Sequence, residues 1–281
     1  MLSRKFFIAF IACSLCVTHV WASCELSRNT DMFYEKLQIL SNRSPVLMHR
    51  NLAPRDEHLP LVLLSYRPTG ATSSVFISAG LHGDEPAAVE SVLQFIERVL
   101  EQPKQYARFN MDFIPLVNPT GWRDCTRLTA QGLDINRQYH LLKGKEVKIL
   151  ENFLRGKHYD LMIDHHEDPR DHVHAFYTVT YGNEDLSAIH GLVATVKSKG
   201  FKLRRFARTE GYFNVGKRLM PVLELRTFML YARNHYSSRV YQVETPTELS
   251  VEQRVLLHNV SNDVLLESLI APKKTPVRDR R

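Results

Sequence analysis

An alternation of apolar runs with helix-period segments most constrains how this chain can fold. Six runs rich in β-branched or aromatic residues predict strands, and four amphipathic segments predict helices. The strands are expected at 61–66, 74–78, 111–117, 160–164, 173–180 and 239–243, and the helices at 86–101, 145–155, 184–199 and 251–269. Because the two kinds of element alternate, the sequence predicts an α/β fold: a single domain with a central mixed, largely parallel sheet flanked by helices.

The N-terminus has the features of an export signal. Arg4 and Lys5 precede an apolar run at 6–17, and Ala22 closes a small-residue cleavage site. The run is shorter than the ~20 residues of a spanning helix, so no stable membrane span is expected after cleavage. The predicted organisation is a signal peptide at 1–22, one folded domain at 23–271 and a disordered tail rich in Lys, Arg and Pro at 272–281.

A signal peptide predicts a periplasmic or secreted protein. Cys13 and Cys16 leave with the signal, so the mature chain keeps Cys24 and Cys125. A disulfide between these two is one expectation in an oxidising compartment, and lipidation of Cys24 is the alternative.

The formal net charge of +7 does not indicate a nucleic-acid partner. Two positive charges leave with the signal, and much of the remainder is local, in the segments 202–208 and 273–281. A basic surface on an exported protein would suit acidic partners such as anionic cell-wall fragments, and a solvated basic face is the alternative.

The segment 78–86 carries the first chemical motif, Ser-Ala-Gly-Leu-His-Gly-Asp-Glu-Pro. It leaves a predicted strand, crosses a glycine-flanked turn and enters a helix at Pro86. His82 and Glu85 therefore lie at the carboxyl end of a strand, where α/β sheets place ligands. An imidazole and a carboxylate three residues apart can be aimed at one metal ion, although this spacing also arises by chance.

Two further strands end in polar groups. The segment 161–169 contains consecutive histidines, His165 and His166, and only one of them can face a given ion because adjacent side chains of a strand point to opposite faces. Glu244 follows the strand at 239–243. A lone carboxylate there is unremarkable, but at the mouth of a metal site it could take a proton from water and pass it to a leaving amine.

A polar stretch follows the strand that is predicted to end at residue 117. It contains Asn-Pro-Thr-Gly-Trp at 118–122 and ends in Asp-Ile-Asn-Arg at 134–137. Arg127 and Arg137 could bind a carboxylate through their planar guanidinium groups, and surface salt bridges are the alternative reading of these residues.

The four segments, in this order, resemble the zinc metallocarboxypeptidase superfamily, which includes the succinylglutamate desuccinylase and aspartoacylase branch. The resemblance rests on His-Gly-Asp-Glu, Asn-Pro-Thr-Gly with Asp-Ile-Asn-Arg, Asp-His-His and Glu-Thr-Pro, and it spans His82 to Glu244. It implies a zinc carboxypeptidase-like catalytic domain at 23–271 that binds one Zn²⁺ per chain.

The resemblance also implies a role for each matching residue. The implied zinc ligands are His82, Glu85 and His166, with water in the fourth position, and Asp134 orients the first histidine. The implied catalytic residues are Glu244, as general base and acid, and Arg127, which stabilises the oxyanion. The implied substrate-binding residues are Asn136 and Arg137, which bind the terminal carboxylate, with Glu167, Asp168 and Tyr177 along the pocket.

The sequence departs from the family pattern in two places. Thr129 replaces the Asn that usually follows the oxyanion arginine by two residues, and the Tyr that covers the substrate in larger members is not located, with Tyr212 and Tyr231 as candidates. His172 and His174 share a strand face and could bind a second metal.

The implied activity is hydrolysis of the C-terminal amide bond of a short peptide with a free carboxylate, and export favours peptidoglycan-derived peptides. Two alternatives stay open. The first is an N-acyl amino acid deacylase that acts on an acyl amino acid, and the second is a non-catalytic, zinc-containing module that binds carboxylates.

Overall fold

The computed structural model describes residues 28–53, 59–169, 175–182, 185–215 and 227–270. The predicted signal peptide, Cys24, the pair His172 and His174, and the predicted basic tail lie outside the described residues. Within the described residues, no helix is both long enough and apolar enough to cross a membrane.

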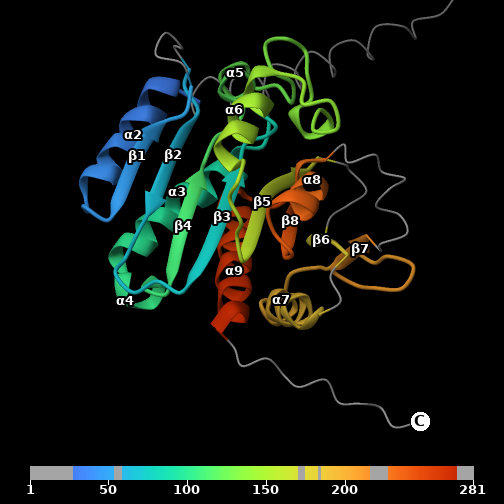
Figure 1. Cartoon of the computed structure of the whole chain (residues 1–281). Helices are drawn as coiled ribbons and strands as arrows, with labels where there is room; N and C mark the ends of the chain where they lie inside the picture. The colour runs from blue at the N-terminus through green and yellow to red at the C-terminus, as the bar shows by residue number, and fades with distance from the viewer. Residues whose placement is uncertain (1–27, 54–58, 170–174, 183–184, 216–226, 271–281) are drawn as a thin grey trace, which may run out of the picture.

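Eight strands form one sheet in the order β1–β2–β4–β3–β5–β8–β6–β7 (Figure 1). Strands β4, β3, β5 and β8 are parallel to one another, whereas antiparallel pairings join β1 to β2, β2 to β4 and β6 to β8. The prediction of an α/β domain with a mixed, largely parallel sheet is confirmed. The strands are β1 (Leu47–Asn51), β2 (Val62–Tyr66), β3 (Ser73–Ala79), β4 (Phe109–Ile114), β5 (Leu161–Asp168), β6 (Tyr177–Tyr181), β7 (Tyr212–Val215) and β8 (Val240–Pro246).

Helices cover both faces of the sheet and bury two hydrophobic cores (Figure 1). One face packs against α2 (Thr30–Asn42), α3 (Pro86–Glu101), α7 (Ser187–Ser198) and α9 (Val251–Ile270), and the other packs against α6 (Lys145–Leu154) and α8 (Phe228–His235). The described residues also contain three short helices: α4 (Pro103–Tyr106), α5 (Pro119–Asp124) and the 3₁₀ helix η1 (Ile135–Arg137).

Alternation along β5 decides which of its side chains reach which layer. Leu161 and Ile163 belong to the core under α3 and α9, whereas Met162 belongs to the core under α6 and α8. Because the same alternation continues to the carboxyl end of the strand, His166 points towards the α6 and α8 side and His165 points towards α3 and α9.

Two predicted strand ends are corrected by the structure. Strands β5 and β8 continue to Asp168 and Pro246, beyond the predicted ends at residues 164 and 243, because their polar terminal residues stay paired, with His166 opposite Glu244. Glu244 therefore lies inside a strand and not in a turn.

The region after residue 114 also differs from the prediction. Strand β4 ends there, and the stretch predicted as a loop contains α5 and η1. Strands β1 and β7 and helices α2 and α8 were not predicted either. These are mostly short or peripheral elements, and α5 contains the poor helix formers Pro, Thr and Gly.

Candidate metal centre and active site

The predicted ligands come together at the carboxyl edge of the central strands. His82 and Glu85 lie in the turn between β3 and α3, and His166 lies on β5, which pairs with β3. The closest approaches are 2.6 Å from His82 Nδ1 to Glu85 Oε1, 2.9 Å from His166 Nδ1 to Glu85 Oε2, and 3.2 Å between the two Nδ1 atoms. All three side chains are buried, and one ligand atom from each lies within 4.8 Å of the others, so the three could hold one metal ion.

A carboxylate lies beside the outer nitrogen, Nε2, of both imidazoles. His166 Nε2 lies 2.8 Å from Asp164 Oδ2, and His82 Nε2 lies 3.3 Å from Asp134 Oδ1. Glu85 faces the other nitrogen, Nδ1, of both rings. In the tautomer that carries its hydrogen on Nε2, each ring presents an Nδ1 lone pair, and these two lone pairs and the Glu85 carboxylate form a set of acceptors that could hold a cation.

Asp164 is a site residue that sequence analysis missed. Its side chain is fully buried, and its Oδ1 accepts a hydrogen bond of 2.6 Å from Ser78 Oγ on β3. The period of two along β5 could have identified it, since Asp164 and His166 share a face of the strand.

The electrostatics of the cluster favour positive charge. Burial alone would lower the pKa of His166, but the carboxylates of Asp164 and Glu85 raise it well above its ordinary value. Burial likewise lowers the pKa of His82, and Glu85 and Asp134 raise it overall. Burial would raise the pKa of Glu85, yet His82 and His166 hold it at about 2. Two imidazoles and one carboxylate are a donor set that suits Zn²⁺, so these residues fit the implied metal.

Glu244 lies beside this cluster on β8, directly opposite His166 in the strand register. Its side chain is buried, and Gln242 Nε2 donates a hydrogen bond of 2.6 Å to its Oε1. Burial raises the pKa of Glu244 to about 7. A carboxylate with a pKa near neutrality is well matched to proton transfer at physiological pH.

A cavity of about 390 Å³ joins these groups to the predicted substrate-binding residues. Arg127, Asn136, Arg137 and Tyr177 all line it, together with the three ligands and Glu244. Arg127 Nε donates to Asp134 Oδ2 at 3.0 Å, and its Nη1 lies 3.2 Å from His82 Nδ1. Two guanidinium groups therefore face one cavity.

Asn136 and Arg137 lie in η1, which is hydrogen-bonded to the start of α8. Arg137 Nη1 donates to the carbonyl oxygen of Asn136 at 3.0 Å. Asn136 Oδ1 accepts a hydrogen bond of 2.9 Å from the N–H of Phe228, at the start of α8. These contacts fix the predicted carboxylate-binding pair against the wall of the cavity.

Two glycines allow the ligand turn to pack against α5. A Cβ built on Gly83 would lie 1.9 Å from the carbonyl carbon of Gly121, which no side chain can tolerate. Asn118 Oδ1 accepts a hydrogen bond from the N–H of Gly121 at 2.9 Å, and Arg28 Nη1 donates to the carbonyl oxygen of Gly83 at 2.5 Å. The His-Gly-Asp-Glu and Asn-Pro-Thr-Gly motifs are therefore parts of one packed unit.

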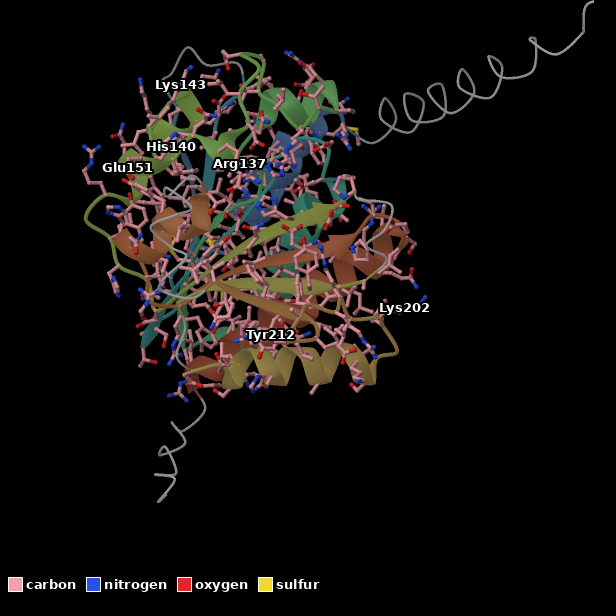
Figure 2. All side chains as sticks on the ribbon, turned by 90° about the vertical axis from the view of Figure 1, so that its right-hand side faces the viewer. Arg137, His140, Lys143, Glu151, Lys202 and Tyr212 are labelled. Carbon is pink, nitrogen blue, oxygen red and sulfur yellow. The ribbon has the colours of Figure 1, made fainter. Side chains whose placement is uncertain are left out.

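The structure shows what Thr129 and the two candidate tyrosines contact. Thr129 is buried, and its hydroxyl accepts hydrogen bonds of 3.3 Å from the N–H groups of Gln131 and Leu133, so it stabilises the loop itself. Tyr212 packs against His190 of α7 (Figure 2), and Tyr231 stacks on His235. Neither tyrosine lines the cavity described above.

The remaining predicted residues lie around the site in different roles. Asp168 accepts hydrogen bonds from Tyr177 Oη at 2.8 Å and Arg204 Nη1 at 3.3 Å on the cavity wall. Glu167 contributes to the wall, but its carboxylate faces α3. Cys125 is disulfide-bonded, while its predicted partner Cys24 lies outside the described residues.

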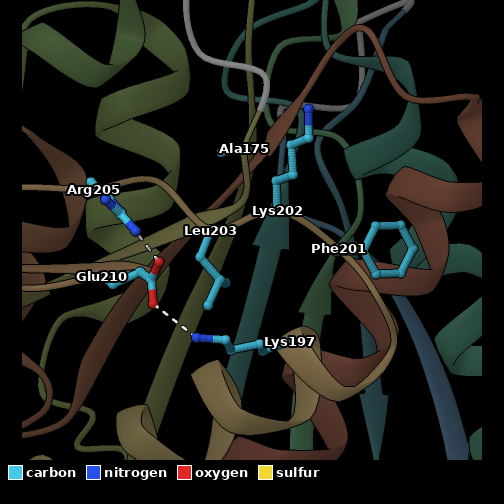
Figure 3. Close-up of a pocket in the computed structure, with 7 residues that line it drawn as sticks. All are labelled: Ala175, Lys197, Phe201, Lys202, Leu203, Arg205 and Glu210. Atoms are coloured by element: carbon cyan, nitrogen blue, oxygen red, sulfur yellow. Dashed lines mark hydrogen bonds and ion pairs between the residues drawn. The ribbon is translucent and has the colours of Figure 1, made fainter.

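A separate hollow of about 410 Å³ lies beside α7 and holds part of the basic segment (Figure 3). Lys202 and Arg205 line it, and Glu210 pairs with Lys197 at 3.3 Å and with Arg205 at 3.6 Å. Part of the positive charge of this surface is thus neutralised locally, and none of the predicted site residues contributes to the hollow.

Comparisons with known proteins agree with this geometry. The model of the succinylglutamate desuccinylase/aspartoacylase catalytic domain matches residues 71–202. A candidate metallopeptidase from Shewanella denitrificans OS217 superposes with a TM-score of 0.70 at 23% sequence identity, covering 86% of this chain and 91% of that chain. A metallo-carboxypeptidase from Burkholderia cenocepacia superposes with a TM-score of 0.65 at 18% identity, covering 85% of this chain and 69% of that chain. No curated protein sequence matches this chain.

A metallo-carboxypeptidase from Pseudomonas aeruginosa, in complex with (2-guanidinoethylmercapto)succinic acid, has the same fold, with a TM-score of 0.64 at 13% identity over 85% of this chain and 68% of that chain. At such low identities these structures establish the fold. The chain therefore has a carboxypeptidase-like fold, and its residues 71–202 resemble the succinylglutamate desuccinylase/aspartoacylase catalytic domain.

Proposed function

We propose that this protein is a zinc-dependent metallocarboxypeptidase that hydrolyses the C-terminal amide bond of short peptides. One observation carries the proposal: a single cavity is lined by the cluster of His82, Glu85 and His166, by Glu244 with its raised pKa, and by two arginines. The cavity thus combines a cation site, a proton acceptor and donors for a carboxylate.

Each side chain has a defined task in this reaction. Arg137 and Asn136 bind the terminal carboxylate of the substrate and position the scissile bond. Glu244 takes a proton from the attacking water and later gives it to the leaving amine. Arg127 donates hydrogen bonds to the carbonyl oxygen as negative charge develops on it. A bound Zn²⁺ would supply Lewis-acid chemistry that polarises this carbonyl and lowers the pKa of water.

The proposed setting is the periplasm or the outside of the cell, because 1–22 has the sequence features of a signal peptide. Peptidoglycan-derived peptides are the favoured substrates in this setting, since they carry free carboxylates that Arg137 would bind and that a basic surface would attract. Fractionation of cells that express the full-length chain, compared with a chain starting at residue 23, tests the localisation.

A second candidate function is supported by the family match. The succinylglutamate desuccinylase/aspartoacylase model covers residues 71–202, which include every predicted site residue except Glu244. An N-acyl amino acid deacylase would use the same cluster and the same arginines, because its substrate is also an amide beside a carboxylate. The substrate, and not the catalytic geometry, separates the two functions.

The deciding experiment uses purified protein with a measured zinc content. Release of amino acids is followed from a library of L-peptides, murein peptides, N-acetyl-aspartate and N-succinyl-glutamate, with Glu244→Gln as the inactive control. Chelator-sensitive release from peptides supports the carboxypeptidase, and release only from the acylated amino acids supports the deacylase. One bound zinc without turnover of any substrate would indicate a binding module, and a protein that binds no metal would contradict the proposal.

A further inference from the structure

A buried ion pair lies behind the candidate metal centre, on the opposite face of the sheet. Glu167 on β5 pairs with Arg254 on α9, and their side chains are 0% and 10% exposed. Glu167 directly follows His166 in the chain, but its side chain points away from the ligands because alternate residues of a strand face opposite sides. The proposed reaction gives neither residue a task.

Glu167 is hydrogen-bonded to the start of α3. Its Oε1 accepts from the N–H of Ala87 at 2.6 Å and from the N–H of Ala88 at 3.1 Å. These two residues lie in the first turn of α3, immediately after Glu85 and Pro86. One carboxylate therefore connects the strand that bears His166 to the helix whose N-cap is Glu85.

This contact replaces a helix cap that the sequence does not provide. The N-cap residue of a helix normally accepts hydrogen bonds from the first free N–H groups. Glu85 is the N-cap residue of α3, yet it makes no capping hydrogen bond because its carboxylate faces His82 and His166. A carboxylate from the neighbouring strand satisfies these N–H groups and also interacts favourably with the helix dipole.

Arg254 stabilises the negative charge of Glu167 in its buried position. An isolated carboxylate in the protein interior is strongly disfavoured unless it is paired and hydrogen-bonded. Glu167 has both kinds of partner: two backbone N–H groups and the guanidinium of Arg254. Removing the guanidinium would leave a buried charge, which then favours movement of either the strand end or the first turn of α3.

We propose that Glu167 and Arg254 are positioning residues that hold the Glu85-bearing turn at a fixed distance from His166. The inference rests on the metal site of the proposed function and is independent of the substrate. Because Glu85 lies within 2.9 Å of both histidines, a small shift of the α3 terminus would misplace a ligand. Loss of the pair should therefore weaken metal binding.

The test measures Zn²⁺ affinity by chelator competition and the visible absorption spectrum of the Co²⁺-substituted protein, which reports ligand geometry. Arg254→Met is expected to raise the Zn²⁺ dissociation constant by about 10–100-fold, the usual range for outer partners of metal ligands, and to alter the Co²⁺ spectrum. Arg254→Lys should restore most of the affinity. Glu167→Gln keeps the shape of the side chain and one acceptor oxygen but removes the negative charge that pairs with Arg254. It provides a second variant if Arg254→Met does not fold.

A second ion pair, between α3 and α9, provides a matched control. Arg98 on α3 pairs with Asp263 on α9 at 2.9 Å, remote from the ligands. Arg98→Met should lower the urea midpoint while leaving the Zn²⁺ affinity and the Co²⁺ spectrum at wild-type values. Wild-type values for Arg254→Met and Glu167→Gln, or equal weakening of zinc binding in Arg98→Met, would overturn the inference. A wild-type protein that binds zinc but cleaves no substrate would contradict the proposed function alone.

Discussion

Asp164→Asn tests whether the outer carboxylates orient the candidate zinc ligands. Asp164 accepts hydrogen bonds from Ser78 Oγ at 2.6 Å and from His166 Nε2 at 2.8 Å. The Asn side chain has the same shape but has only one acceptor oxygen. If its NH₂ group faces His166, the ring hydrogen moves to Nδ1, and the atom that faces the cluster is no longer a free ligand.

The expected loss of zinc affinity follows from two independent magnitudes. A hydrogen bond to a charged group contributes about 1.5–3 kcal/mol. Removal of an outer partner of a metal ligand typically weakens metal binding by about 10–100-fold, which corresponds to ~1.4–2.8 kcal/mol. We therefore expect the Zn²⁺ dissociation constant of Asp164→Asn to rise by about 10–100-fold, with turnover recovering in part at saturating zinc.

Competition with a chromophoric chelator measures this change, and the same pair of strands supplies a control. Asp160 Oδ2 accepts from the N–H and Oγ of Ser74, at 2.8 and 3.0 Å, in the same cross-strand arrangement but away from the histidines. Asp160→Asn should bind zinc as the wild type does. An unchanged zinc affinity in Asp164→Asn would refute the orienting role.

Three other predictions concern the base, the ligand turn and pH. Glu244→Gln should abolish turnover while zinc stays bound, because the amide cannot accept the proton; metal content and kcat together check this, and loss of zinc would assign Glu244 a ligand role. Gly83→Ala should prevent the turn from packing on Gly121, with a loss of stability of several kcal/mol seen as a lower urea midpoint; a wild-type midpoint would contradict the packing argument. Burial lowers the pKa of His165 to about 3 and that of His258 well below its ordinary value. Both stay neutral in the folded state while the unfolded chain takes up protons below about pH 6.5, so each histidine should lower the free energy of unfolding by up to ~1.4 kcal/mol per pH unit as the pH decreases, and the raised pKa of Glu244 should offset one of these two contributions; a urea midpoint that does not fall between about pH 6.5 and pH 5 would count against this.

Local patterns predicted which side chains come together at the site. The turn between β3 and α3 brings His82 and Glu85 together through residues close in the chain, and Pro86 begins α3 as its position in the motif indicates. The period of two along β5 correctly allowed only one of His165 and His166 to reach a common ion, although residue spacing alone did not say which one.

Short helices were missed because their stability comes from contacts outside their own sequence. Helix α5 is capped by Asn118 and packed through Gly121 against the ligand turn. The first N–H of α8, from Phe228, is bound by the side chain of Asn136, which lies far from it in the chain. No periodicity within six to eight residues reports such contacts.

Local periodicity and turn chemistry are enough to predict the alternation of strands and helices and the side chains that stand at the strand ends. The contacts that support those side chains depend instead on how the elements pack in three dimensions. Asp164 reaches Ser78, and Glu167 joins the start of α3 to Arg254 on α9. These partners are distant in the chain, and only the order of strands in the sheet and the docking of α9 bring them within hydrogen-bonding distance.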